Sequence, residues 1–505
     1  MSYLHERILQ LLACSAVVVA CCTSEVHAQL NERLLNGAGL EIQWENNLGG
    51  SGLAQGEQSL TLWPHATERR EFVDVYVGNR LIERIDARQA DRAAIDRLIL
   101  EGKSLKPTPV LGMEGARARA AELKKTYSIL GKQVSTQEFS EPVIYLVAAT
   151  RNGIITAIDA ESGEVLWQST VPNAYLSVYG PGVSDEHVTV VNGNALYAME
   201  LKTGNLLTTS RLLFTPTSSP MPMGDYIMVP SVDGRLMGYH LEKPLIKPIY
   251  LRSGIENRNS TAMSTNRQFL AWCSQGSLFM VHNEREPIIW SKVNAGEDAD
   301  SRPVPTQQGF VFCSHFGTVI HASTNRLGTY LWRANLGMPT MRSPVVGNNR
   351  VFVLSDDGLL ACLDLETGNA AWPSRAQNIN QILGVGKEAV YVRDTTGTLI
   401  SLRLSDGQPL ARTGTLIQGS IPNSINDRLF VVTRDGHITC LRESGAIKPT
   451  MYIDPSNKSA PANEGRPGQA NKETAKPATN EDPFSPSGLD AAPAARDAKD
   501  PFDPF

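Results

Sequence analysis

The chain has 505 residues, of which 41% are hydrophobic and 20% charged, and this composition is ordinary for a globular protein. The net charge of −5 at pH 7 argues against nucleic acid as a partner, because proteins that hold phosphate backbones carry a basic surface. Beyond the N-terminal segment the sequence has no apolar run long enough to span a membrane, so no transmembrane helix is predicted in the mature chain.

Residues 1–28 are typical of an export signal. An apolar stretch over 8–22 ends in small residues, and the small residues around Ala28 predict cleavage before Gln29. The stretch that ends at Cys21 resembles a lipobox instead, in which this cysteine is acylated and becomes the new N-terminus. The sequence therefore predicts an exported protein, either periplasmic or a membrane-anchored lipoprotein, with a lipid anchor as its only membrane contact.

The cysteines do not predict a disulfide framework or a metal site. Three of the seven lie in the predicted signal, and the four that remain are Cys273, Cys313, Cys362 and Cys440. Four cysteines are too few to staple a chain of this length, and none has the spacing of a zinc ligand set.

A repeat of about 41 residues dominates the middle of the chain. A turn residue recurs at intervals of 39–42 residues, at Gly153, Asn194, Gly234, Gly276, Gly317, Gly358, Gly397 and Gly436. The residue before it is often Asn, Gly or Asp, and such pairs supply the positive φ that tight hairpins need. An aliphatic residue follows two positions later in every copy, and apolar residues occupy both faces of the flanking strands. Sheets covered on both faces are expected where blades pack radially.

Two copies carry a second motif that resembles the repeat of the pyrroloquinoline-quinone-type β-propellers. The motif runs from Ala157 through Asp159 and Gly163 to Trp167, and it recurs from Cys362 to Trp372. The resemblance covers residues 140–450 and implies an all-β fold, a β-propeller of about eight four-stranded blades, with seven as the alternative. In that family the tryptophan docks one blade on the next, and the residues in this position are Trp167, Trp290, Trp332 and Trp372. The chain also resembles propeller-only exported proteins, and its architecture is similar to that of the propeller lipoprotein of outer-membrane β-barrel assembly.

The segment before the repeats predicts a hairpin and two helices. Residues 71–77 and 80–86 form the hairpin pattern and, with Trp44, are interpreted as a degenerate repeat whose strands complete or close a blade. Helical patterns follow at 90–101 and 114–131, as an insertion or a small lid. The apolar stripe of the second comprises Ala116, Ala120, Leu123, Tyr127 and Leu130.

The predicted organisation is a signal peptide at 1–28, an N-terminal segment at 29–139, the propeller at 140–452 and a tail at 453–505. The tail is rich in Pro, Ala, Asn, Lys and Asp, and it is predicted to be disordered because it buries too little apolar surface. It carries three Asp-Pro-Phe copies, interpreted either as docking motifs or as repeats of a low-complexity tail. Their anchors would be Phe484, Phe502 and Phe505.

The mouth of the central channel is the candidate binding surface. Alignment on the recurring prolines places polar residues of the innermost strands there: Ser219, Thr261, Arg302, Arg342, Ser343, Gln381 and Ser420. Two guanidiniums that face a narrow channel could bind a carboxylate or an acidic peptide. The alternative is that they pair with acids of the inner strands or line a water-filled channel.

No catalytic residue or metal ligand is predicted, and an enzyme is not expected. A quinoprotein needs a Ca²⁺ site of oxygen ligands, a catalytic carboxylate and an aromatic wall, and no cluster of Asp, Glu and Asn stands apart from the turn positions. The predicted function is a monomeric, non-catalytic exported propeller that acts as a protein-binding scaffold at the cell envelope, without a cofactor. The alternatives are a quinoprotein oxidoreductase dependent on pyrroloquinoline quinone (PQQ) and Ca²⁺, and a sensor of a small anionic ligand at the axial channel.

Overall fold

The structure is a computed structural model. It describes residues 32–48, 59–78, 80–87, 112–173, 175–252, 263–274, 276–283, 286–299, 301–416, 419–421, 423–432, 437–453 and 455. The predicted signal, the helical pattern at 90–101, the three Asp-Pro-Phe copies, Thr261 and Gly436 lie outside the described residues.

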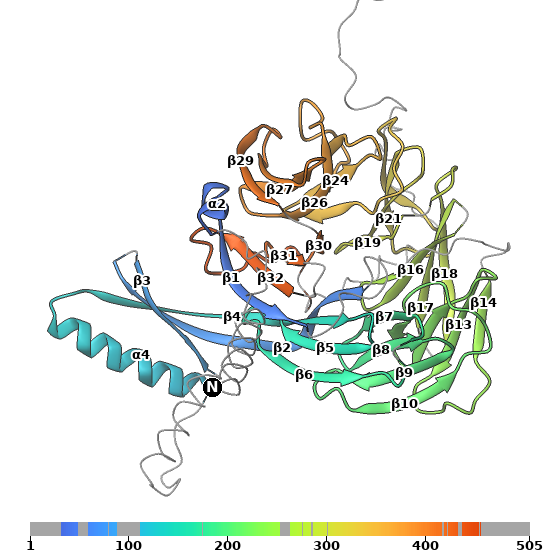
Figure 1. The fold of residues 1–505 in the computed structure, drawn as a ribbon, viewed down its shortest axis with the longest axis horizontal. Coiled ribbons are helices and arrows are strands. Elements are labelled where there is room, and N and C mark those ends of the chain that lie inside the picture. Colours follow the sequence, from blue (N-terminus) through green and yellow to red (C-terminus); the bar gives the residue numbers. More distant parts are fainter. Residues whose placement is uncertain are drawn as a thin grey trace, which may run out of the picture.

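Eight antiparallel sheets follow one another around a central axis, in the order of the sequence (Figure 1). The prediction of an all-β, eight-bladed propeller is therefore confirmed. Blade 1 contains part of β2 (Leu60–Val77), part of β4 (Val134–Ala149), β5 (Ile154–Asp159) and β6 (Val165–Thr170). Blade 2 contains β7 (Val178–Val183), β8 (His187–Asn192), β9 (Ala195–Glu200) and β10 (Leu206–Arg211). Blade 3 contains β11 (Met221–Met223), β12 (Tyr226–Pro230), β13 (Arg235–His240) and β14 (Ile249–Arg252).

The remaining blades continue this arrangement. Blade 4 contains β15 (Ser264–Thr265), β16 (Phe269–Ser274), β17 (Ser277–Asn283) and β18 (Pro287–Asn294). Blade 5 contains β19 (Val304–Pro305), β20 (Gly309–Cys313), β21 (Thr318–Ser323) and β22 (Tyr330–Asn335). Blade 6 has three strands, β23 (Val345–Gly347), β24 (Arg350–Leu354) and β25 (Leu360–Asp364). Blade 7 contains β26 (Ile379–Val385), β27 (Ala389–Asp394), β28 (Thr398–Arg403) and β29 (Pro409–Leu416). Blade 8 contains β30 (Gly419–Ile421), β31 (Leu429–Val432), β32 (His437–Glu443) and β1 (Leu40–Asn47).

The ring is closed by the N-terminal strand. β1 follows the short helix α2 (Glu32–Gly37) and pairs antiparallel with β32, so that it forms the outer strand of blade 8. The inner strand of blade 1 is the first part of β2, which pairs with the last part of β4. The propeller therefore begins near residue 40, and the boundary expected at residue 140 falls inside a strand, because two of the propeller's strands come from the N-terminal segment.

A projection, here called the arm, extends from blade 1. Beyond the propeller, β2 and β4 pair again over 69–77 and 134–142, β3 (Arg80–Asp86) adds to the far edge of β2, and helix α4 (Gly112–Ile129) packs on this sheet. Figure 1 shows these elements projecting to the left of the ring. The predicted hairpin and the second predicted helix are present, but they extend blade 1 and do not form a further repeat.

Helix α4 covers the arm with only part of its apolar stripe. Ala116 and Ala120 are buried against strand residues such as Val73, whereas Leu130 is 63% exposed. Within the described residues, no helix is both long and apolar enough to span a bilayer.

The recurrent turns have the expected backbone. Positive φ occurs in six of the predicted turn glycines: Gly153, Gly234, Gly276, Gly317, Gly358 and Gly397. In the second copy the positive φ belongs to Gly193 and not to the predicted Asn194, because glycine takes this conformation without a Cβ clash.

Tryptophans on the outer strands, and Trp372 in the segment after β25 of blade 6, connect neighbouring blades. Each indole nitrogen donates a hydrogen bond of 2.7–2.9 Å to a carbonyl in the next blade, in the pairs Trp44–Ala160, Trp167–Leu201, Trp290–Thr324, Trp332–Leu365 and Trp372–Leu404. Except for Trp290, each ring also lies against a glycine of that next blade, at Gly163, Gly204, Gly368 and Gly407 respectively. The motif thus acts across two blades: its aspartate caps a turn, as Asp364 does by accepting from the amides of Glu366 and Thr367, and its glycine receives the tryptophan of the preceding blade.

Candidate functional site: the axial cavity

A cavity of about 200 Å³ lies on the propeller axis. Its walls come from the inner strands, or residues next to them, of blades 1 to 6 and blade 8. The lining residues used below are Leu62, Trp63, Asn266, Arg267, Arg302, Val304, Ser343, Ser424, Ile425, Ile453 and Pro455. Most of the wall is apolar, because inner strands contribute Leu, Val, Ile and Pro side chains. Proline is tolerated here since the inner strand is a sheet edge and its missing N–H leaves no ladder bond unmade.

One wall is built around Asp185. Arg267 Nη2 lies 3.2 Å from Asp185 Oδ1, and Trp63 Nε1 donates to the same oxygen at 2.8 Å. The guanidinium also lies 4.6 Å from the centroid of the Trp63 ring, and it donates to the carbonyl of Pro64. Burial would raise the pKa of Asp185, but the hydrogen bonds from Arg267 and Trp63 outweigh it and lower the pKa below its usual value. This carboxylate is therefore a fixed anion that orients Arg267.

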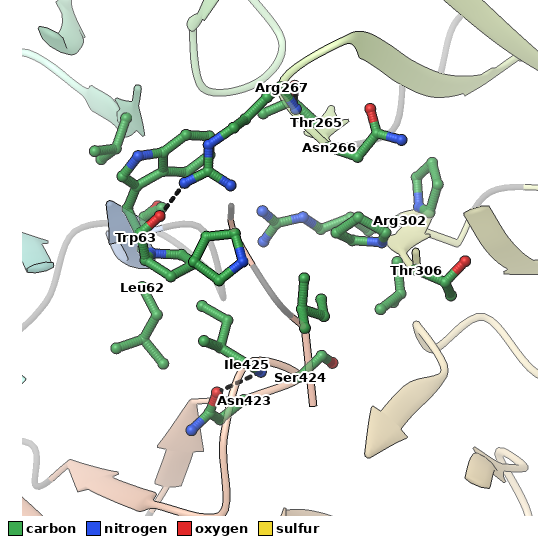
Figure 2. A pocket seen from close by; sticks show the side chains of 18 of the residues that line it. Leu62, Trp63, Thr265, Asn266, Arg267, Arg302, Thr306, Asn423, Ser424 and Ile425 are labelled. Atoms are coloured by element: carbon green, nitrogen blue, oxygen red, sulfur yellow. Dashed lines mark hydrogen bonds between the residues drawn. The ribbon is translucent and has the colours of Figure 1, made fainter. Parts of the chain in front are cut away.

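Arg302 enters the cavity from the opposite side. Figure 2 shows its side chain reaching from the start of β19 toward the middle of the space, between Trp63 and Thr306. Its backbone N–H donates to Ser343 Oγ at 3.1 Å, which fixes the strand that carries it. The cavity therefore holds two guanidiniums, on Arg267 and Arg302.

The sequence predicted a different pair, Arg302 and Arg342. Arg342 is not among the lining residues, and its side chain donates to the carbonyl of Asn380 in blade 7. Arg267 was missed because it lies in the turn between β15 and β16, outside the proline-aligned segment. The structure shows the equivalence that the proline alignment does not: Asn266 and Thr306 each donate a backbone hydrogen bond to the residue three positions later. Arg267 in blade 4 therefore corresponds to Gln307 in blade 5, and both residues line the cavity.

The other channel candidates occupy various positions. Ser343 lines the cavity, whereas Ser219 is buried and is not among the lining residues. Gln381 Nε2 donates to the carbonyl of Ser420 at 3.3 Å, and Ser420 Oγ donates to the carbonyl of Ile382. These last contacts join the inner strands of blades 7 and 8.

The lining fits an anion better than a metal-bound cofactor. It contains two arginines and neither Asp nor Glu, and in the described part of the chain no group of three or more His, Cys, Asp or Glu side chains could hold a metal ion. A Ca²⁺-bound quinone needs carboxylate oxygens around the ion, so these residues do not fit it. The lining also contains an unpaired hydrogen-bond donor. Asn266 Nδ2 is buried and finds no hydrogen-bond acceptor within the described residues.

A second cluster of charges lies where blade 8 meets blade 1 and the arm. Arg428 in blade 8 is fully buried and binds both carboxylate oxygens of Glu161 in blade 1, at 2.9 and 3.2 Å. Arg70 at the base of the arm binds Asp86 at 2.6 Å and Asp159 at 2.9 Å. These ion pairs connect the closing blade, the first blade and the arm.

Glu141 lies in the same cluster, on β4. Burial, and after it the carboxylate of Glu161, raise the pKa of Glu141, whereas Arg84, Arg70 and Arg428 oppose the shift, and the resulting pKa is about 8. The side chain is therefore protonated near neutral pH in the folded protein.

The eight radial sheets, the Asp–Gly–Trp motif and the axial cavity together define a β-propeller of the PQQ-like repeat class. The sequence model of one family, described as outer membrane protein assembly factor BamB, matches residues 124–243 and 275–419. This match covers just over half of the chain, and the chain therefore belongs to this family.

The curated relatives are distant. The chain is 22% identical over 291 residues to the outer membrane protein assembly factor BamB of Moranella endobia (strain PCIT), covering 52% of this chain and 74% of that protein. It is 21% identical over 321 residues to the BamB of Yersinia pestis, covering 58% of this chain and 80% of that protein.

Two solved structures give similar coverage. The crystal structure of BamB from Moraxella catarrhalis has a TM-score of 0.45 at 17% identity and covers 59% of this chain and 93% of that chain. The computationally designed Ika8 protein has a TM-score of 0.44 at 14% identity and covers 59% of this chain and 92% of that chain.

Proposed function

We propose that this protein is a non-catalytic, exported β-propeller that binds other proteins at the cell envelope and acts there as an assembly scaffold. Its relatives carry the name outer membrane protein assembly factor, which supports this class of role. The observation that carries the proposal for this chain is the arm, a projection with an open strand edge and an exposed apolar end.

The arm offers a surface suited to protein binding. Over 134–142, β4 pairs with β2 on one side, and its partner on the other side, β5, pairs only with 145–149. Within the described residues this leaves one edge of the strand open, and residues 135–138 are exposed. An extended segment of a partner can add to such an edge through backbone hydrogen bonds. Beside it, α4 ends in Ile129, which is 85% exposed, and Leu130 follows at 63%.

The arm is held firmly on the propeller, as a scaffold requires. Asp74, on β2 in the arm, is fully buried and accepts from Arg84 Nε at 3.0 Å. Arg84 Nη1 donates to the carbonyl of Ile447, in the segment that follows blade 8, at 3.1 Å. Lys448 in that segment also lies 3.4 Å from Asp74. A surface fixed before binding loses less conformational entropy when a partner docks.

The test is a comparison of two double variants of the full chain. Ile129→Glu/Leu130→Glu places two charges at the apolar end of the arm. Leu245→Glu/Ile246→Glu makes the same change at a pair of adjacent residues that are 100% and 55% exposed in the loop between β13 and β14. Each chain is cross-linked in intact envelopes, purified and analysed by mass spectrometry. Partners that the wild-type chain binds should be lost from the arm variant and kept by the loop variant. Identical partner sets for the wild-type chain and both variants would contradict the proposal.

The proposed location is tested on the same material. The mass of the mature N-terminal peptide should correspond either to acylated Cys21 or to a chain that begins at Gln29. A chain that retains Met1 in the envelope fraction would contradict export.

A further inference from the structure

The last described residues of the chain lie in the wall of the axial cavity. Tyr452 donates its backbone N–H to the carbonyl of Ile425 at 2.8 Å and its hydroxyl to the carbonyl of Val385 at 2.7 Å. These bonds fasten the segment after blade 8 to blades 7 and 8, and Ile453 and Pro455 then form part of the cavity lining. Pro455, the last described residue before the tail at 456–505, therefore lies at this cavity.

The cavity suits a ligand that combines an aromatic ring with an anion. Its volume is about 200 Å³, and an apolar protein cavity of about 150 Å³ is known to hold a benzene ring. Leu62, Val304 and Ile425 supply apolar wall. Arg302 brings a guanidinium into the space, and Asn266 adds an amide donor at the wall.

The tail carries this combination three times. Each Asp-Pro-Phe copy places a carboxylate two residues before a phenyl ring, and Phe484, Phe502 and Phe505 are the only aromatic residues of the sequence after Tyr452. The proline between them restricts the backbone, so that less conformational entropy is lost when both groups are held at once.

We propose that the axial cavity binds an Asp-Pro-Phe segment of the chain's own tail. The phenyl ring lies among Leu62, Val304 and Ile425, and the aspartate faces Arg302. The occupant is intramolecular because the tail starts at the cavity. The sequence has 26 residues between Pro455 and Asp482, and a random coil of this length has an end-to-end distance of about 30 Å. Such a link gives an effective concentration on the order of 1 mM.

This inference goes beyond the proposed scaffold role and does not depend on it. It uses the cavity on the axis, whereas the scaffold test uses the end of the arm. The variants below leave Ile129 and Leu130 unchanged. Failure of the cavity proposal therefore leaves the scaffold proposal standing, and failure of the scaffold proposal leaves the cavity proposal standing.

The first experiment frees the cavity in the full chain. A labelled peptide with the sequence of residues 480–485 is titrated, with fluorescence anisotropy as the readout, against the wild-type chain and against Phe484→Ala/Phe502→Ala/Phe505→Ala. The triple variant should bind the peptide at least about tenfold more tightly than wild type, because the tethered copies compete in wild type when the peptide Kd is about 0.1 mM or below. A peptide with Phe484→Ala should not bind either chain.

The second experiment locates the site, using the triple variant as the parent chain. Arg302→Gln should weaken peptide binding about tenfold or more, because a charge-assisted hydrogen bond is lost. Arg342→Gln is the matched control, since this arginine precedes the inner strand of the next blade and does not line the cavity. Ser424→Trp places a bulky ring at a residue that lines the cavity while keeping Arg302, and it should also abolish binding.

The results divide as follows. The proposal is supported if the triple variant binds the peptide more tightly than wild type does, and if Arg302→Gln and Ser424→Trp weaken this binding while Arg342→Gln does not. Equal affinity of the peptide for wild type and the triple variant overturns it, because the cavity is then open to segments supplied by other proteins. Absence of binding to the triple variant, or an equal effect of Arg302→Gln and Arg342→Gln, also overturns it.

Discussion

The contact between Trp332 and Gly368 gives a sharp test of how the blades are held together. The Trp332 ring is 6% exposed, and its Nε1 donates to the carbonyl of Leu365 at 2.8 Å. Gly368 has a φ of +72°, and a Cβ at this position would lie 2.6 Å from ring atoms of Trp332. Gly368→Ala therefore combines two penalties, a strained backbone and a clash with the ring.

The two penalties have known sizes. A non-glycine residue in the left-handed region costs about 1–2 kcal/mol, and overpacking a tight site costs about 1–3 kcal/mol. Gly368→Ala should thus lower the free energy of unfolding by about 2–5 kcal/mol. Trp332→Ala should lower it by about 3–5 kcal/mol through loss of the buried ring. In the double variant the alanine at position 368 has no indole ring to clash with. Its loss in the free energy of unfolding should therefore be about 1–3 kcal/mol smaller than the sum of the two single-variant losses.

The measurement is urea unfolding of the four chains of this cycle, followed by tryptophan fluorescence and circular dichroism. Gly445→Ala is the control, because Gly445 has a φ of +80° and nothing lies within 4 Å of an added Cβ. It should show the backbone penalty alone, about 1–2 kcal/mol. Strict additivity of Trp332→Ala and Gly368→Ala would refute the docking role of this glycine.

Three further predictions concern buried groups. The pKa of Glu141 is raised to about 8, chiefly by burial, so the stability that it contributes in its protonated form is lost as the pH rises from about 4.5 toward 8. Glu141→Gln should therefore be more stable than wild type by a few kcal/mol at about pH 8.5 and equal to it at about pH 4.5 in urea unfolding; the same difference at both values would contradict this. Arg428→Met leaves the Glu161 carboxylate without its guanidinium and should lower the free energy of unfolding by about 3–5 kcal/mol, with part of the loss recovered by adding Glu161→Gln. Burial raises the pKa of Cys313 and Cys362 to about 12, so iodoacetamide should modify them in urea and leave them unmodified in the native protein, as read by site-resolved mass spectrometry.

The blade count could be predicted from the sequence because the information is local. Each hairpin turn needs a residue with positive φ, and Gly153 or Gly358 marks such a turn whatever the rest of the chain does. The alternation of apolar residues around the turns is equally local. The exception at Asn194 is a shift by one position, to Gly193, which the spacing alone does not distinguish.

The path of the N-terminal segment could not be predicted in the same way. β1 pairs with β32, and Glu41 accepts from Arg442 at 2.7 Å although some four hundred residues separate them. β2 belongs to the propeller at one end and to the arm at the other, with a break in its pairing between Pro64 and Arg69. Pairing over such distances depends on the whole ring being complete.

The cavity residues were predicted in part, for a similar reason. The proline alignment finds strand positions, and Arg302 and Ser343 do line the cavity. It does not tell which way a long side chain turns, and Arg342 turns to a carbonyl of blade 7. Arg267 owes its place to Asp185 and Trp63, which come from two other blades.

At the junction between blades 7 and 8 the motif tryptophan is absent, and another element packs in its place. Four residues after the motif glycine, blade 7 has Ala411 in place of tryptophan, and the added Cβ at Gly445 in blade 8 meets nothing. Helix α2 lies here instead: its Leu35 is fully buried in a cluster with Tyr391 of blade 7 and Leu441 of blade 8. Helix α2 thus makes the apolar contact that a tryptophan ring makes at the junctions where the motif is present. Since α2 leads directly into β1, the same segment that closes blade 8 also seals it against blade 7, and closure of the ring makes the tryptophan dispensable at this junction.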